Sequence, residues 1–257
     1  MAHAPVSLVD SLLFRHALSA WDRAAERAEN SDPARLRPLR ARALALRHRL
    51  DRVIHAVDGR LARPPAGAGG RGLPLGCDWL WRPEMWCGPL SPPGVVAPES
   101  GTAFGAGMRL FHDCIRPELV LRQIARSGPG DRPPHALRLE VFRFEGSFLS
   151  LAIDLPAAAM TGLRRRHLIR LDAAIETERP LGIFARLNIR HGPNTAQLVR
   201  AIPPDTPEIE LEFDLAVIGL DEDRVGKMWL DLIFEAPQMN CITLHDLLLS
   251  RRPRAEP

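Results

Sequence analysis

The residues with the most obvious chemistry are three tryptophans that fall within eight positions. Trp79, Trp81 and Trp86 lie among prolines in the segment CDWLWRPEMWCGPLSPPG. Rigid indole rings with one polar N–H can stack on sugar rings or bind a partner. They can equally plug the open end of a fold or dock a helix, and the sequence leaves both interpretations open.

A polar run, NIRHGPN at 188–194, is the second candidate. It follows an expected strand and ends in a Gly-Pro turn. Alternation along the strand places Arg186, Asn188 and Arg190 on one face, and the last residues of the run fall on a loop, where binding residues are common. A solvated basic face is the alternative. The residues expected to bind a polar ligand are Trp79, Trp81, Trp86, Arg186, Asn188, Arg190, His191 and Asn194.

The sequence contains no G-x-G-x-x-G, P-loop, nucleophile-elbow or H-E-x-x-H motif. His112, Asp113 and Cys114 are adjacent, but alternation sends Asp113 to the opposite strand face, so the three cannot bind one ion from a regular strand. We therefore expect no catalytic residue, no metal and no cofactor. An enzyme would need two or more of the strand-end histidines in one cleft. Those histidines are His112, His167, His191 and His245.

The composition argues against a general polyanion binder, because 34 basic and 31 acidic residues leave a net charge of only +3. All the basic residues except Lys227 are arginines. This bias indicates GC-rich coding rather than nucleic-acid affinity, so no nucleic-acid partner is expected. The N-terminus lacks the pattern of a signal peptide, and no run approaches the roughly 20 apolar residues of a spanning helix. We expect a cytoplasmic protein whose four cysteines are free thiols.

Residues 1–63 are expected to form a helical hairpin, with helices at 7–29 and 33–63 and a short break between them. Apolar residues in the second helix recur every three or four positions, which is the seam of a coiled coil. Between residues 35 and 60, eight arginines accompany this seam, against two aspartates. The narrow seam favours packing on another helix, including self-association through 33–63, and contact with an acidic membrane surface is the alternative.

The segment 64–76, PPAGAGGRGLPLG, is expected to be a linker. From about residue 107 the apolar period becomes two, without intervening helices. This pattern predicts an antiparallel β-sandwich or jelly roll over 77–257. Apolar matching favours two hairpins, with loops at 145–147 and 178–180, which would pair Arg138 with Asp154 and Asp172 with Arg186.

A third hairpin is expected between the last two strands of the chain. It would place Asp231 opposite His245. The nearby Trp229 lies within the first of these strands, and we expect it to be largely buried.

Three segments carry a resemblance to a known family. They are ALRLEVFRFEGSFLSLAIDLP, GLRRRHLIRLDAAIETERPLGIFARLNIRHGPNTAQLVR and KMWLDLIFEAPQMNCITLHDLLLSRRPRAE. Over about 79–256 the chain resembles an uncharacterised family of alphaproteobacterial proteins from Rhodobacter-like bacteria, which implies no activity and no site residues. The strand plan and the last strand, 242–247, also resemble carbohydrate-binding jelly rolls, a likeness of fold that does not establish function.

These observations favour a non-enzymatic binding or scaffolding protein. Its sandwich would recognise a glycan or an anionic small ligand, and its helices would mediate self-association. Two alternatives stay open. One is an enzyme with an unrecognised His/Asp site, and the other is an envelope factor that associates with a membrane surface.

Overall fold

The computed structural model describes residues 8–29, 31–61, 76–126, 132–204 and 206–254. The chain divides into two compact units, residues 1–54 and 55–257. Apart from Gly76, the expected linker at 64–76 lies outside the described residues, and the predicted three-part division stays a prediction.

The first unit contains the expected pair of helices, α1 (Leu8–Ala28) and most of α2 (Pro33–Leu61). Helix α2 begins at a proline, whose fixed φ suits the first helical position, and the backbone N–H of Arg35 bonds to the carbonyl of Asp32 at 2.9 Å. At the end of α1, Ser31 Oγ donates to the carbonyl of Arg27 at 2.6 Å. These local bonds hold the turn between the helices.

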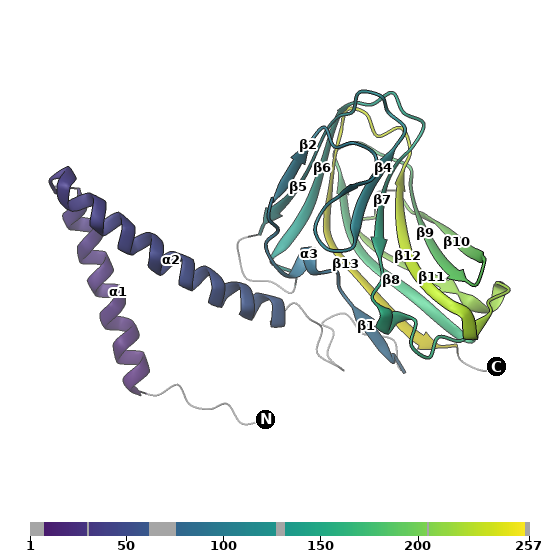
Figure 1. Cartoon of the computed structure of the whole chain (residues 1–257), viewed down its shortest axis with the longest axis horizontal. Helices are drawn as coiled ribbons and strands as arrows, with labels where there is room; N and C mark the ends of the chain where they lie inside the picture. The colour runs from purple at the N-terminus through teal and green to yellow at the C-terminus, as the bar shows by residue number, and fades with distance from the viewer. Residues whose placement is uncertain (1–7, 30, 62–75, 127–131, 205, 255–257) are drawn as a thin grey trace. The chain divides into compact units, whose positions relative to one another are not determined.

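The second unit is an antiparallel β-sandwich, which confirms the predicted fold class (Figure 1). Sheet A has the order β11-β8-β13-β6-β5-β2, with β1 paired to β13, and sheet B has the order β10-β9-β12-β7-β4-β3. The strands are β1 (Trp79–Trp81), β2 (Gly94–Val96), β3 (Thr102–Ala103), β4 (Met108–His112), β5 (Glu118–Ala125), β6 (His135–Arg143), β7 (Leu149–Asp154), β8 (His167–Thr177), β9 (Ile183–His191), β10 (Asn194–Ile202), β11 (Glu208–Asp214), β12 (Val225–Phe234) and β13 (Asn240–Pro253).

The connections mostly cross from one sheet to the other, as in a jelly roll. Strands β6 and β7 lie in different sheets, and so do β8 and β9, and β12 and β13. The three expected hairpins are therefore wrong. Arg138 is opposite Thr243 and Asp154 is opposite Trp229, while Asp231 is opposite Arg186 rather than His245.

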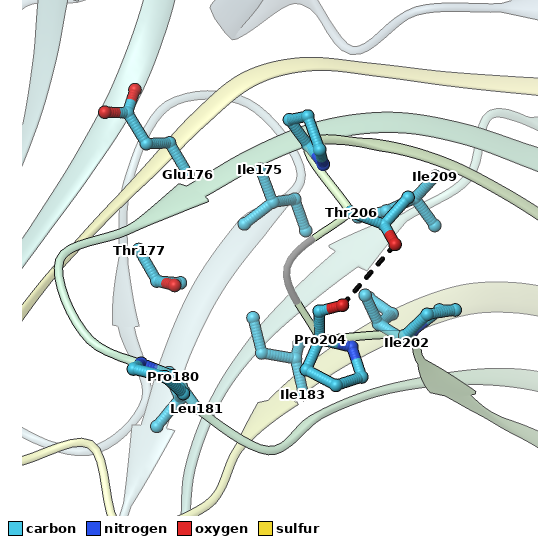
Figure 2. A pocket seen from close by; sticks show the side chains of 12 residues that line it. Ile175, Glu176, Thr177, Pro180, Leu181, Ile183, Ile202, Pro204, Thr206 and Ile209 are labelled. Atoms are coloured by element: carbon cyan, nitrogen blue, oxygen red, sulfur yellow. Dashed lines mark hydrogen bonds between the residues drawn. The ribbon is translucent and has the colours of Figure 1, made fainter.

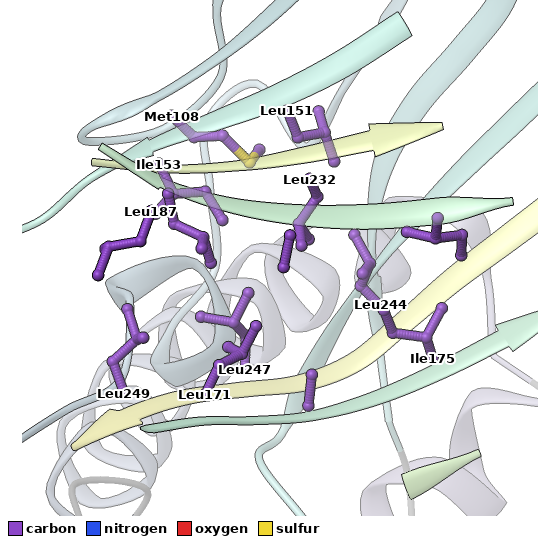
Figure 3. Packing of buried hydrophobic residues seen from close by; sticks show 14 of the residues in the cluster. Met108, Leu151, Ile153, Leu171, Ile175, Leu187, Leu232, Leu244, Leu247 and Leu249 are labelled. Carbon is purple, nitrogen blue, oxygen red and sulfur yellow. The ribbon is translucent and has the colours of Figure 1, made fainter. Parts of the chain in front are cut away.

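The core lies between the inner faces of the two sheets (Figure 3). Met108, Leu151 and Leu232 of sheet B face Leu244 and Leu247 of sheet A, and all five side chains are at most 1% exposed. The period of two in the sequence produces this result, because successive side chains of a strand point to opposite faces. In β13 a register shift between Leu244 and Asp246 interrupts the period, and both Leu244 and Leu247 face the core.

Strand β13 organises sheet A because it pairs along its whole length. On one side it pairs with β8, and on the other it pairs first with β6 through residues 240–244 and then with β1 through residues 249–251. Arg251 anchors the second pairing. It is 6% exposed, and its Nε and Nη2 donate to the carboxylate of Asp78 at 2.9 and 3.1 Å.

Candidate functional site

The outer face of sheet B gathers polar and aromatic side chains from neighbouring strands. The strand registers arrange them in rows across β10, β9, β12, β7 and β4. One row holds Val199, Arg186, Asp231, Ala152 and Arg109, and the next holds Gln197, Asn188, Trp229 and Asp154. We call these nine residues, together with Arg190 and Lys227, the sheet-B face.

A hydrogen-bonded network centres on Asp231 of β12. Its Oδ2 accepts from Arg186 Nε at 3.0 Å and Nη2 at 2.8 Å, and from Asn188 Nδ2 at 2.9 Å. Gln197 Nε2 then donates to Asn188 Oδ1 at 3.1 Å. Asp231 is 4% exposed and Asn188 is fully buried, so this network is fixed in place on an otherwise solvent-facing side of the sheet.

Trp229 lies beside this network and is half-buried, not largely buried as the sequence suggested. The Lys227 ammonium lies 5.4 Å from the centroid of the indole ring. The same ammonium pairs with Asp154 at 2.8 Å, and both side chains of that pair are 43% exposed. The indole is therefore accessible, and its neighbours are charges that solvent and a ligand can both reach.

An apolar row borders the polar one. Phe184 is opposite Ile233, and Phe111 on β4 is opposite Ser150. The three apolar side chains are half-buried. The face thus combines aromatic surface with oriented donors, which is the composition of sites that bind amphipathic ligands.

Two further arginines make the face basic. Arg109 and Arg190 are exposed, and within the described part of the chain neither forms a hydrogen bond or ion pair. With Arg186 and Lys227 they give four cations, against the carboxylates of Asp154 and Asp231.

The structure divides the predicted polar patch. Arg186, Asn188 and Arg190 share the outer face of β9, as expected. His191 is instead the last residue of β9, is 7% exposed, and its Nδ1 accepts from the backbone N–H of Asp221 at 3.2 Å. Asn194 is exposed and opens β10 opposite His191. Only two residues form this turn, because Gly192 adopts a φ of +59°.

The tryptophan cluster lies with the other sheet. Trp86 is fully buried in the short helix α3 (Glu84–Cys87), and its indole N–H donates to the carbonyl of Leu244 at 3.1 Å. Trp79 and Trp81 stack at a centroid separation of 6.4 Å and pack, half-buried, against the core. The eight predicted residues therefore do not form one surface: β1 and α3 belong to sheet A's side of the sandwich, while Arg186, Asn188 and Arg190 lie on sheet B.

Sequence reasoning missed Trp229, Asp231 and Gln197 as parts of the face. A signal for them was present. Lys227, Trp229 and Asp231 alternate with Met228 and Leu230, and the alternation indicates an outward-facing set on β12. The expected pairing with His245 places Asp231 beside the wrong strand, whereas in the structure it is opposite Arg186.

The histidines have separate partners. His112 Nε2 lies 2.9 Å from the carbonyl of Pro98, and His245 Nε2 lies 2.8 Å from Glu176 Oε2. His167 Nδ1 accepts from the backbone N–H of Arg164, and burial together with the nearby Arg251 charge lowers the pKa of His167. Among the described residues, no group of three or more His, Cys, Asp or Glu could hold a metal ion.

A pocket opens where the β8–β9 and β10–β11 connections meet (Figure 2). Its volume is about 180 Å³. Isoleucines, prolines and Leu181 dominate the lining, and its polar side chains are Glu176, Thr177 and Thr206. Thr206 Oγ1 donates within its own loop, to the carbonyl of Pro204 at 3.4 Å. With so few oriented polar groups, this pocket is a weaker candidate than the sheet-B face.

Several solved structures are similar to this chain. The enzymatically active domain of tailspike protein 4 from Bacteriophage CBA120 has 7% identity and a TM-score of 0.41, over 60% of this chain and 21% of its own, so this chain spans about a fifth of its length. The family 11 carbohydrate-binding module from Clostridium thermocellum, solved with a β-1,3-1,4-mixed-linked tetrasaccharide, has 11% identity and a TM-score of 0.39, over 62% and 95%. The CBM22-1–GH10 modules of Clostridium thermocellum xylanase 10B, solved with xylohexaose, have 8% identity and a TM-score of 0.38, over 64% and 29%. The similarity is one of fold.

No curated protein matches the sequence. The model of a family described as a family of unknown function, DUF6478, matches residues 1–257. Within the described residues, no helix is long and apolar enough to cross a membrane. The cytoplasmic location, the coiled coil and the alphaproteobacterial origin stay predictions.

Proposed function

The chain belongs to DUF6478, a family of unknown function, and we propose that its sandwich is a non-enzymatic module that binds a polar ligand of the glycan class on the sheet-B face. One observation carries this proposal. A half-buried indole, Trp229, lies next to donors and acceptors that the Asp231 network holds in fixed positions.

A sugar ring presents an apolar face of C–H groups and a rim of hydroxyls. The indole of Trp229 suits the first, since aromatic rings combine a large flat surface with little conformational freedom. Arg186 and Gln197, which the buried Asp231 and Asn188 hold in place, suit the hydroxyls. Because their mutual hydrogen bonds already fix these side chains, binding a ligand costs little further side-chain entropy.

The same network supports binding rather than catalysis. A general base needs an oxygen that can accept a proton from the substrate. Oδ2 of Asp231 already accepts from Arg186 and Asn188, and Asp154 is paired with Lys227. The carboxylates of the face therefore orient cations and amides.

Of the residues first expected to bind a ligand, Arg186, Asn188 and Arg190 belong to the proposed site. Trp229 and Gln197 join them there. Trp86 has a packing role in it, because its ring is fully buried and its N–H is satisfied. Trp79 and Trp81 close the sandwich beside β13, where they lie opposite Arg251 and Leu249.

The test is calorimetric titration of the full chain with neutral and carboxylated oligosaccharides. Trp229→Ala should weaken binding by about 30-fold or more, the effect of losing an anchoring aromatic side chain at about 2 kcal/mol. Trp79→Phe, which changes a half-buried indole on the other sheet, is the matched control and should bind normally. Loss of binding in Trp79→Phe with full binding in Trp229→Ala would refute the assignment, and so would no binding of any glycan.

A further inference from the structure

The helix pair contains exposed apolar side chains that its own packing does not cover. None of the side chains described in α1 and α2 is buried. In the first half of α1, Leu12, Leu13, Phe14 and Leu18 are 58%, 63%, 64% and 50% exposed. Phe14 and Leu18 lie one turn apart on one side of the helix, and Leu12 and Leu13 lie on its other sides, so apolar side chains are exposed all round the first half of α1.

Part of this apolar surface continues along one side of the helix. Phe14, Leu18 and Trp21 are four and three residues apart, so they share one face of α1. Asp22 and Glu26 follow Leu18 in steps of four, so they border this face towards the end of the helix. The apolar face is half-buried near the turn, at Trp21, and exposed towards the start of the helix, at Phe14.

Helix α2 covers only part of this face. Its seam is half-buried at Leu36, Leu39 and Leu46, near the turn, but Leu50 and Val53 are 51% and 60% exposed. Figure 1 shows α1 and α2 diverging away from the turn that joins them. The predicted seam therefore packs over its first turns and leaves the rest uncovered.

Helix α2 also supplies a strong positive charge. Between residues 33 and 50 it holds six arginines and no Asp or Glu. All six are exposed, at positions 35, 37, 40, 42, 47 and 49. The unit thus combines an apolar face with a dense cationic one.

We propose that the helix pair docks on an anionic lipid surface, with the apolar face of α1 in the headgroup region and the arginines of α2 against the lipid charges. Amphipathic helices with an arginine-rich polar face and exposed Leu and Phe bind membranes in this way. Because no described helix could cross a bilayer, the unit lies on the surface.

The charge and the exposed apolar side chains favour an anionic lipid surface over a second copy of the chain and over a nucleic acid. A second copy would bring six arginines against six arginines, and like charges at an interface are unfavourable. A nucleic acid would satisfy the arginines through its phosphates, but it would leave Phe14 and Leu18 in water. An anionic bilayer offers negative headgroups to the arginines and an apolar region to Phe14 and Leu18.

The experiment is co-sedimentation of the full chain with vesicles of phosphatidylcholine containing 30% phosphatidylglycerol, beside vesicles of phosphatidylcholine alone. Binding should occur to the anionic vesicles, and it should weaken as salt rises from 50 to 500 mM, because salt screens the surface potential. Equal binding to both vesicles, or no binding to the anionic ones at low salt, would overturn the proposal.

Two pairs of variants separate the components. Arg37→Gln with Arg40→Gln should weaken binding about 25-fold, from about fivefold for each charge near an anionic surface. Phe14→Gln with Leu18→Gln should weaken it at least as much, and glutamine preserves helix propensity. The control is Ile115→Gln with Arg116→Gln, a 95% exposed apolar residue and an exposed arginine on the sandwich, which should bind fully.

Three outcomes would contradict the lipid assignment. Full binding by the Phe14/Leu18 variant would remove the role of the apolar face. Tighter binding to RNA than to the anionic vesicles would point to nucleic acid. A dimer that the Phe14/Leu18 variant dissociates, in the absence of lipid binding, would make the occupant a second copy. Each result is independent of glycan binding by the sandwich.

Discussion

The edge strand β11 of sheet A and the centre of sheet B arrange charged side chains differently. Sheet A carries a row of acidic residues on β11, each matched by an arginine. Its ion pairs are Arg132–Glu208, Arg170–Glu210, Arg252–Glu212 and Arg254–Asp214, at 3.3, 2.6, 2.8 and 3.2 Å. Sheet B places one buried carboxylate, Asp231, under aromatic and amide side chains.

This difference distinguishes a strand edge that is protected from pairing from a surface that can recognise a ligand. Solvent-exposed ion pairs contribute only about 0–1 kcal/mol each, but a charged row on β11, the edge strand of sheet A, prevents pairing with another chain. A buried carboxylate whose Oδ2 accepts from Arg186 and Asn188 contributes through the side chains that it orients. Sheet A therefore has a closed surface, and sheet B has one that is arranged for contact.

The largest expected effect that tests this comparison is loss of the central carboxylate. Asp231→Ala removes the acceptor of the Arg186 guanidinium, and it leaves the amide of the fully buried Asn188 only the backbone carbonyls of Arg186 and Trp229, at 3.1 and 3.5 Å. The free energy of unfolding should fall by about 2–3 kcal/mol, because unsatisfied buried donors are costly. Urea denaturation of the full chain measures it, and a loss below about 1 kcal/mol would show that the network is not structural.

The second effect concerns the geometry of the same pair. Arg186→Lys keeps the charge but cannot donate through two nitrogens to Asp231 Oδ2 as the guanidinium does. We expect a loss of about 1 kcal/mol in stability together with weaker ligand binding, both read from the same denaturation and titration experiments. Normal ligand binding by this variant would mean that the positive charge at position 186 is sufficient, and that the two-nitrogen geometry of the guanidinium is not required.

A smaller effect is expected on sheet A. Glu212→Ala removes the partner of Arg252, a pair whose side chains are 38% and 24% exposed. Stability should change by less than about 1 kcal/mol, and the change should diminish in 0.5 M salt. If Glu212→Ala lowered the free energy of unfolding as much as Asp231→Ala does, the proposed difference between the two sheets would be wrong.

The smallest effect is a pH dependence at the start of β8. Burial and the Arg251 charge lower the pKa of His167 below the 6.5 of an unperturbed imidazole. The unfolded chain then binds more protons below pH 6.5, so the contribution of His167 is complete above that pH and is lost as the pH falls towards its folded pKa. His167→Gln should flatten this part of the stability–pH curve. An unchanged curve would assign the slope to other groups.

Alternation predicted which face each strand residue occupies, but it could not predict the sheet. The hairpin expected with a loop at 145–147 illustrates the reason, because it would place Leu139 opposite Ile153. Both residues are buried in the core, yet Leu139 lies in sheet A and Ile153 in sheet B. Apolar matching cannot distinguish an in-plane neighbour from one across the core, because both arrangements bury the same side chains.

The candidate site was only partly predictable for the same reason. Arg186, Asn188 and Arg190 follow from one strand's alternation, and the structure places them together. Asp231 and Gln197 reach the site through strand pairing, which no local pattern encodes. The end of β11 was not predictable either. Alternation of acidic and apolar residues from Glu208 would extend the strand to residue 218, but it ends at Asp214, because the Asp214 carboxylate accepts from the N–H of Ala216 at 2.9 Å and starts a 3-10 turn.

The long strand β13 has a consequence for how the protein is made. It forms the middle of sheet A, between β8 on one side and β6 and β1 on the other, yet β6 ends 97 residues before β13 begins. At about 5–20 residues per second of synthesis, β6 and β8 leave the ribosome several seconds before their shared partner. During that time both strands lack the partner that covers one of their edges, so we expect nascent chains that stop before residue 240 to aggregate more readily than the full chain.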